Sequence, residues 1–340
     1  MLKYSLVAGV AQLVEQLIRN QQVTGSSPVT SSKEIKQPYG LLNFLLKYYS
    51  FIGDAMDLCN LSVIKSLMAD AGISFRKEFG QNFLTNRIIP EDIADNAADT
   101  PESLIIEIGP GIGTLTQELA MRYRRVVAIE IDKGLIPILN KTLADYDNVS
   151  VINEDVMKCD LHAIIEKYSD GMPVAVCANL PYYITTPIVM MLLESGIKLS
   201  SITVMIQNEV AARLVSKPGS SDYGAITAVL GFYGEARKLF KVSRGCFIPM
   251  PKVDSAVVRI DLFKEAKYTP KNEKLFRDLI RAAFEMRRKT LQNAISAKLP
   301  HINKESVISA LDSIGHDINV RGERLSTEDF VKLSDFLSEI

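Results

Sequence analysis

The sequence predicts an α/β protein with an open, mostly parallel sheet that is followed by a small all-helical segment. Short apolar, β-branched runs alternate with helical stretches between residues 104 and 262, and a glycine-rich turn directly follows the first of these runs. Beyond Phe263 the pattern becomes helical. Strands that alternate with helices indicate a parallel sheet, and 340 residues suffice for two cores.

Composition narrows the classes of function. The chain has 39 basic and 40 acidic residues, so a nucleic-acid site would have to be a local patch. Its four cysteines form no CxxC pair and its three histidines fall in no ligand spacing, which predicts a reduced, metal-free, cytosolic protein. No apolar run is long enough to span a bilayer.

Residues 1–55 differ from the rest, because a weak helical period soon gives way to Gln, Ser, Thr and Pro. The segment also resembles the peptide produced when a transfer-RNA gene region is translated by mistake. We therefore expect Met56 to be the authentic start. The other interpretation is a poorly ordered extension with a short amphipathic helix at residues 41–49.

The first buried strand is expected at residues 104–108, and Gly109-Pro110-Gly111-Ile112-Gly113 follows it at once, opening a helix at 114–121. Glycines let the backbone approach a nucleotide-like ligand, and the helix amino terminus offers unpaired N–H groups. A second strand, 126–129, ends in Glu130, about where an acid reaches ribose hydroxyls. Dinucleotide and S-adenosylmethionine sites both stay open, and the EIGPGIG form favours the latter.

A third strand at 149–152 leads to Asp155, which could accept a hydrogen bond from an adenine amino group or could be a solvent-facing loop carboxylate. A fourth strand, 174–178, ends in Asn179-Leu180-Pro181-Tyr182. The Asn179 amide and the next carbonyl can accept from an exocyclic amine, and Tyr182 offers a stacking face. An ordinary strand-ending turn would also contain Asn and Pro.

Farther along, Phe247 precedes a Pro-x-Pro loop, and it could be a core residue or a second stacking face opposite Tyr182. The remaining elements are predicted as helices at 62–71, 90–98, 187–195, from about 208 and 225–233, and strands at 202–206, 239–242 and 256–262.

The helical segment is predicted to begin with one long helix, from about Asn272 to Ala297. Residues 267–304 carry ten Lys or Arg against three acids, with Arg287-Arg288-Lys289 at the centre. This excess predicts a phosphate-contacting surface, although a solvated helix face would look the same. The last helix is expected to begin at Ser326 or Thr327, with Asp329 placed for a capping box.

Taken together, the segments KEFGQNFL, EIGPGIGTLT, AIEID, EDV, NLPYYITTPI, KPGSSDYGAI and FIPMPKVDSAV resemble the small-subunit (16S) ribosomal RNA adenine dimethyltransferase family, the KsgA or RsmA type. The resemblance covers residues 56–340. It implies a Rossmann-like methyltransferase domain at 56–263, mostly parallel with an antiparallel last strand. It also implies a helical RNA-binding domain at 264–340.

The resemblance further implies S-adenosylmethionine-dependent dimethylation of two adjacent adenosines in the loop of the 3′-terminal hairpin of 16S rRNA, late in 30S assembly. The partner would be the 16S rRNA of the immature 30S subunit. The enzyme would bind it as a monomer in the cytoplasm, with no membrane involved. The residues that match the family's cofactor site are Asn82, Leu84, Gly109, Glu130, Asp155 and Asn179. Those that would handle the target base are Asn179, the Leu180 carbonyl, Tyr182 and Phe247.

Three rivals stay open at this point. The first is the related macrolide-resistance enzyme that methylates an adenosine of 23S rRNA, although the KPGSSDYGAI loop and PKVDSAV look closer to the small-subunit family. The second is a non-catalytic assembly factor with this fold, against which intact Asn179, Tyr182 and Phe247 argue. A DNA amino-methyltransferase is the third.

Overall fold

The computed structural model describes residues 56–73 and 81–339. The predicted extension at 1–55 and the start of the KEFGQNFL segment lie outside these ranges. Residues from 58 onward form one compact unit. Within the described ranges we find no helix whose length and apolar character would let it cross a bilayer.

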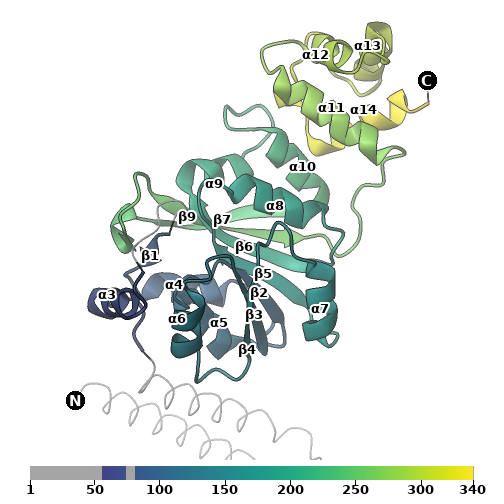
Figure 1. The fold of residues 1–340 in the computed structure, drawn as a ribbon. Helices are drawn as coiled ribbons and strands as arrows, with labels where there is room; N and C mark the ends of the chain where they lie inside the picture. Colours follow the sequence, from purple (N-terminus) through teal and green to yellow (C-terminus); the bar gives the residue numbers. More distant parts are fainter. Residues whose placement is uncertain (1–55, 74–80, 340) are drawn as a thin grey trace, which may run out of the picture. The chain divides into compact units, whose positions relative to one another are not determined.

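A seven-stranded sheet forms the centre of the fold (Figure 1). In spatial order its strands are β4 (Val149–Asn153), β3 (Arg125–Glu130), β2 (Leu104–Ile108), β5 (Val174–Asn179), β6 (Leu199–Gln207), β9 (Ser255–Leu262) and β7 (Gly234–Val242). The first five are mutually parallel, and β9 is antiparallel to both of its neighbours. This confirms the mostly parallel sheet with an antiparallel last strand.

Helices pack on both faces of the sheet. Those of the first half are α4 (Ile88–Asp95), α5 (Thr114–Arg122), α6 (Ile136–Thr142) and α7 (Leu161–Ser169), and α3 (Leu61–Asp70) precedes them in the chain. Those of the second half are α8 (Thr185–Glu194), α9 (Asn208–Leu214) and α10 (Ala225–Tyr233). A separate two-stranded ribbon pairs β1 (Phe83–Leu84) with β8 (Phe247–Ile248), just after the short 3₁₀ turn η2 (Arg244–Cys246).

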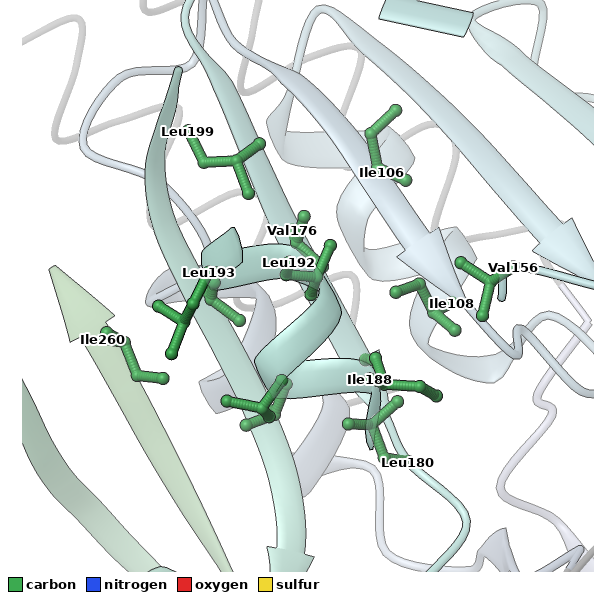
Figure 2. Close-up of a cluster of buried hydrophobic side chains, with 14 of the residues drawn as sticks. Ile106, Ile108, Val156, Val176, Leu180, Ile188, Leu192, Leu193, Leu199 and Ile260 are labelled. Atoms are coloured by element: carbon green, nitrogen blue, oxygen red, sulfur yellow. The ribbon is translucent and has the colours of Figure 1, made fainter. Parts of the chain in front are cut away.

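Successive side chains of a strand point to opposite faces of the sheet, so each face packs against its own set of helices. On β6, Ile202 and Val204 belong to the core that α7, α8 and α9 cover, whereas the Thr203 hydroxyl points to the other face. There it donates to the backbone carbonyl of Asn96, at the end of α4. Figure 2 shows Ile188, Leu192 and Leu193 of α8 reaching the strands in this core.

The carboxyl-terminal part is a bundle of α11 (Glu273–Glu285), α12 (Leu291–Lys298), α13 (Lys304–Ser313), the 3₁₀ turn η3 (Gly322–Arg324) and α14 (Thr327–Leu337). Its core also takes in Tyr223, Ala228 and Val229, which precede or belong to α10. The domain boundary predicted near residue 263 stays a prediction. The capping box at α14 is present, because Ser326 and Asp329 each bond the other's backbone N–H.

The single long helix predicted at 272–297 is wrong. The chain leaves helical geometry at Met286 (φ −117°, ψ 44°), and α12 begins only after Thr290, which is extended. Between them the Arg287 guanidinium donates to the backbone carbonyls of Ser221 and Tyr223, both at 2.9 Å. The apolar period survives the break because both helices face the same core.

The strand predicted at 239–242 is much longer, spanning Gly234–Val242 as β7. It pairs with β9 alone and so forms an edge of the sheet. Its first half carries exposed charged residues, including Glu235 and Lys238, in place of an apolar run. Edge strands are commonly charged in this way, which hides them from a hydrophobicity pattern.

Candidate active site

A pocket lies at the carboxyl ends of β2, β3 and β5, where ligands bind in open α/β sheets. It holds about 850 Å³ of empty space, part of it open to solvent. The residues that line it come from β1 and the two residues before it, the end of β2, the glycine turn, the start of α5, the end of β3 with the loop that follows, and the turn after β5, namely Gln81, Asn82, Phe83, Leu84, Glu107, Gly109, Pro110, Gly111, Thr114, Leu115, Glu130, Ile131, Leu135, Asn179, Leu180, Pro181, Tyr182 and Tyr183.

The glycine turn leaves room for a ligand. Gly109 has φ +70°, and a Cβ placed there would meet no atom within 4 Å, so it would project into the pocket that Gly109 lines. Gly113, also left-handed, ends the turn and is followed by the first residue of α5, Thr114. The amino terminus of α5 therefore faces this end of the pocket.

Glu130, at the end of β3, is fixed by the same turn. Its two carboxylate oxygens accept from the backbone N–H groups of Gly111 at 3.2 Å and Asp132 at 2.8 Å. Burial raises the pKa of Glu130 to about 7. Each carboxylate oxygen has a second lone pair, so the fixed carboxylate can still accept hydrogen bonds from ligand hydroxyls.

Glu107 is a pocket residue to which the sequence analysis assigned no role. It is 1% exposed near the carboxyl end of β2, and its Oε2 has no hydrogen-bond partner among the described residues. The buried hydroxyl of Thr114, also on the pocket wall, lacks a partner as well. Burial raises the pKa of Glu107 to about 8. The available signal was a lone acid inside an otherwise apolar strand.

Asn179 and Leu180 both line the pocket, and each has an oxygen acceptor without a partner among the described residues. The Asn179 amide nitrogen donates to the backbone carbonyl of Asn82 at 3.3 Å, which turns Oδ1 the other way. The Leu180 N–H donates to the backbone carbonyl of Met205 on β6 at 3.1 Å, and the residue, 1% exposed, has its side chain in the core beneath α8 (Figure 2). No described residue donates to Asn179 Oδ1 or to the Leu180 carbonyl.

A hydrogen bond at its hydroxyl group fixes the side chain of Tyr182. Its hydroxyl is 2.7 Å from the Ser255 hydroxyl at the start of β9, and the ring is partly buried on the pocket wall. Burial raises the pKa of Tyr182. The hydrogen bond fixes the phenol at its far end, so the ring face can meet a ligand without first being ordered.

The comparisons with known proteins agree with this geometry. Over residues 72–339 the chain matches the family described as ribosomal RNA adenine dimethylase. The chain belongs to this family. A ribosomal RNA small subunit methyltransferase A from Lachnoclostridium phytofermentans is 48% identical over 268 residues, which are 78% of this chain and 92% of that protein.

Two solved structures are similar to this member of the ribosomal RNA adenine dimethylase family. A dimethyladenosine transferase from Plasmodium falciparum has a TM-score of 0.64 and 26% identity, covering 74% of this chain and 95% of that one. A 23S rRNA methyltransferase, ErmE, has a TM-score of 0.59 and 28% identity, covering 75% and 99%. The protein is thus an rRNA adenine dimethyltransferase that uses S-adenosylmethionine.

The pocket of this dimethylase fits that cofactor. Two buried oxygens without protein partners, those of Glu107 and Thr114, can bond an amino acid moiety, and Glu130 can bond ribose hydroxyls. No atom lies within 4 Å of a Cβ placed on Gly109, so a ligand can come close to the backbone there. When bound, the cofactor supplies an electrophilic methyl group on a sulfonium.

The predicted site residues of the dimethylase are only partly brought together. Asn82 and Leu84 line the pocket with the glycine and NLPY turns. Asp155 does not line it, since its carboxylate accepts from the Met157 N–H at 3.0 Å within its own loop. Phe247 is 5% exposed and pairs with Leu84 across the two-stranded ribbon, one strand away from the pocket wall. The roles predicted for all of these residues, Asp155 and Phe247 included, stay predictions.

The basic surface predicted around Arg287 divides into two kinds of residue. Arg287 binds the loop carbonyls of Ser221 and Tyr223 and also pairs with Glu323 at 3.3 Å. Arg288 and Lys289 are exposed, and their side chains form no hydrogen bond or ion pair with any described residue. Of the three, these two are the cations that can meet phosphates without breaking protein contacts.

Proposed function

We propose that this enzyme transfers methyl groups from S-adenosylmethionine to the N6 amines of two adjacent adenosines in the loop of the 3′-terminal hairpin of 16S rRNA. The observation that carries the proposal is that Asn179 and Leu180 line the pocket at the strand ends, while no described residue donates to Asn179 Oδ1 or to the Leu180 carbonyl. An exocyclic amine has two N–H donors, one for each acceptor.

These acceptors explain how a poor nucleophile can react. The lone pair of an adenine amine is conjugated with the ring, so attack requires the nitrogen to become tetrahedral. Two hydrogen bonds fixed in direction by the protein favour the pyramidal, partly positive nitrogen over the flat one. Alignment of nitrogen and methyl can lower the barrier by roughly a further 7–11 kcal/mol.

The same pair of acceptors can serve both methylations. In each transfer the cofactor, when bound, would supply the methyl group, and the amine would release one proton to water once its new N–C bond has formed. The monomethylated amine keeps one N–H, which still finds one acceptor. The second transfer therefore uses the same pocket with the first methyl group in the place of a hydrogen.

The target base must leave its stack to reach the pocket. Tyr182, anchored through Ser255, is ready to receive one face of the base, and Phe247 is proposed for the other. Because Phe247 is now buried beside Leu84, the β1–β8 ribbon would have to shift for it to contact the base. Stacking of about 1–3 kcal/mol per base would offset part of the cost of extrusion.

The substrate particle is proposed to be the immature 30S subunit, late in its assembly in the cytoplasm, and the enzyme is proposed to act as a monomer. Support for a small-subunit substrate comes from the relative named for that subunit, which is 48% identical, against 28% for the 23S rRNA methyltransferase. Methylation assays on immature 30S particles and on naked 23S rRNA would separate the two substrates.

The decisive variant is Asn179→Ala. Loss of one preorganised hydrogen bond of this kind lowers turnover by roughly 10²–10³-fold, whereas affinity for 30S particles should persist. Methyl transfer from labelled S-adenosylmethionine to immature 30S particles measures the first quantity, and particle co-sedimentation the second. Asn293→Ala, at an exposed position of α12, is the matched control and should leave both unchanged. Wild-type turnover in Asn179→Ala would contradict the proposal.

A further inference from the structure

We propose that Tyr183 is a stacking platform for the nucleotide next to the target adenosine. The inference rests on the proposed function, because it concerns how the same pocket holds its RNA. It assigns a substrate contact to a residue of the NLPYYITTPI segment that has no predicted role in the cofactor or target-base site. Its basis is the conformation of the turn that follows β5.

Tyr182 and Tyr183 occupy the two central positions of a four-residue turn. The turn closes with the Ile184 N–H donating to the Pro181 carbonyl at 3.2 Å. Both tyrosines line the pocket, but only the first is fixed, by its 2.7 Å contact with Ser255. Tyr183 is 63% exposed and makes no hydrogen bond, ion pair or ring contact with any described residue.

The exposed ring is therefore explained neither by packing nor by a polar contact of its hydroxyl. Consecutive Cα atoms are about 3.8 Å apart, so this ring starts one residue from the one proposed to receive the target base. Tyrosine offers a large, flat contact area and has few side-chain torsions to order. A free aromatic face at a pocket mouth is suited to bind a second flat group.

Base flipping supplies such a group. When one base leaves its stack, the neighbouring base loses a stacking partner on the side of the extruded nucleotide. That uncovered face lies next to the pocket mouth, one backbone step from the flipped nucleotide. The ring of Tyr183 can replace the lost stack without regard to base identity, because every base has a π-face. Because two adjacent adenosines are targets, Tyr183 would stack on one of them while the other is in the pocket.

The test is a double-mutant cycle between Tyr183 and the neighbouring base. 30S particles are reconstituted with 16S rRNA in which the nucleotide on the 5′ or the 3′ side of one target adenosine is made abasic. Single-turnover methylation of that adenosine and particle affinity are measured with wild type, Tyr183→Ala, Tyr183→Phe and, as an exposed apolar control, Leu61→Ala. Leu61 is 42% exposed at the start of α3.

We expect Tyr183→Ala to lower the ratio of methylation rate to dissociation constant by roughly 5- to 150-fold, the equivalent of one base stack. Tyr183→Phe and Leu61→Ala should match wild type. Removing the base on one side should cost wild type the same factor and should cost Tyr183→Ala nothing more. Wild-type behaviour of Tyr183→Ala, or independent losses on both sides, would overturn the inference.

The particle affinities separate this inference from the proposed function. If wild type binds the particles but transfers no methyl group, the proposed function fails, and the affinity cycle still reports whether Tyr183 and the neighbouring base are coupled. If methylation proceeds but the cycle shows no coupling, the stacking role of Tyr183 fails and the proposed function stands.

Discussion

Replacing Glu107 by Gln should change how stability depends on pH. Glu107 lies 1% exposed in β2, where burial raises its pKa from 4.5 to about 8. The folded state therefore binds this proton more tightly than the unfolded state does. Below pH 4.5 the carboxyl is protonated in both states, and stability is then lost progressively as pH rises through 8, where the folded group ionises.

The magnitude follows from the displacement of the pKa. At about 1.4 kcal/mol per pKa unit, the displacement from 4.5 to about 8 lowers the free energy of unfolding by about 5 kcal/mol in total. About 3 kcal/mol of this loss falls between pH 6 and pH 9. Gln has nearly the same shape and does not ionise. Between these two pH values the wild type should lose about 3 kcal/mol more free energy of unfolding than Glu107→Gln.

Urea unfolding of the cofactor-free protein at pH 6, 7, 8 and 9 measures the effect, with the slope against urea checked for constancy. Glu102→Gln, whose side chain is 67% exposed, is the control and should follow the wild-type profile. The explanation would be refuted by parallel pH profiles of wild type and Glu107→Gln. It would be refuted equally by a wild type that gains stability across this range.

Further predictions concern the basic loop and the glycine turn. Arg288→Ala combined with Lys289→Ala should weaken binding to 30S particles and reduce its salt slope by one to two, as co-sedimentation against salt would show. Arg287→Ala, which loses two hydrogen bonds to loop carbonyls, should mainly lower stability by about 1–3 kcal/mol in urea unfolding. Gly109→Ala and Gly72→Ala should cost similar stability, since both glycines have positive φ and open surroundings. Only Gly109→Ala should weaken S-adenosylmethionine binding measured by calorimetry, and equal affinities would contradict its place in the pocket.

The strands of the sheet were predictable wherever a fully buried strand appears in the sequence as an unbroken apolar run. The strand expected at 104–108 is β2 without change, and α10 begins and ends where its period indicated. The pattern failed where another contact decided the backbone. The edge strand β7 pairs with a neighbouring strand on one side only and carries charged residues. At the break after α11, Arg287 donates to backbone carbonyls about 65 residues away in sequence.

The pocket was predictable where motif residues follow strands in the parallel part of the sheet. Gly109, Glu130 and Asn179 end neighbouring strands that all point the same way, so their convergence follows from the strand order. Glu107 and Tyr183 could not be assigned, because the burial of one and the exposure of the other depend on packing. Phe247 was predicted either as a core residue or as a stacking face opposite Tyr182, and the structure buries it beside Leu84.

The hydrophobic core holds Leu180 in place. Its side chain lies beneath α8, and its N–H donates to the backbone carbonyl of Met205 on the next strand (Figure 2). Burying a leucine side chain contributes roughly 1.5–3 kcal/mol, so moving this residue would cost both the packing and the hydrogen bond. Leu180 also lines the pocket, and no described residue donates to its carbonyl. An acceptor held by the core in this way needs no reorganisation when the amine arrives, which is the condition under which a hydrogen bond lowers a barrier most.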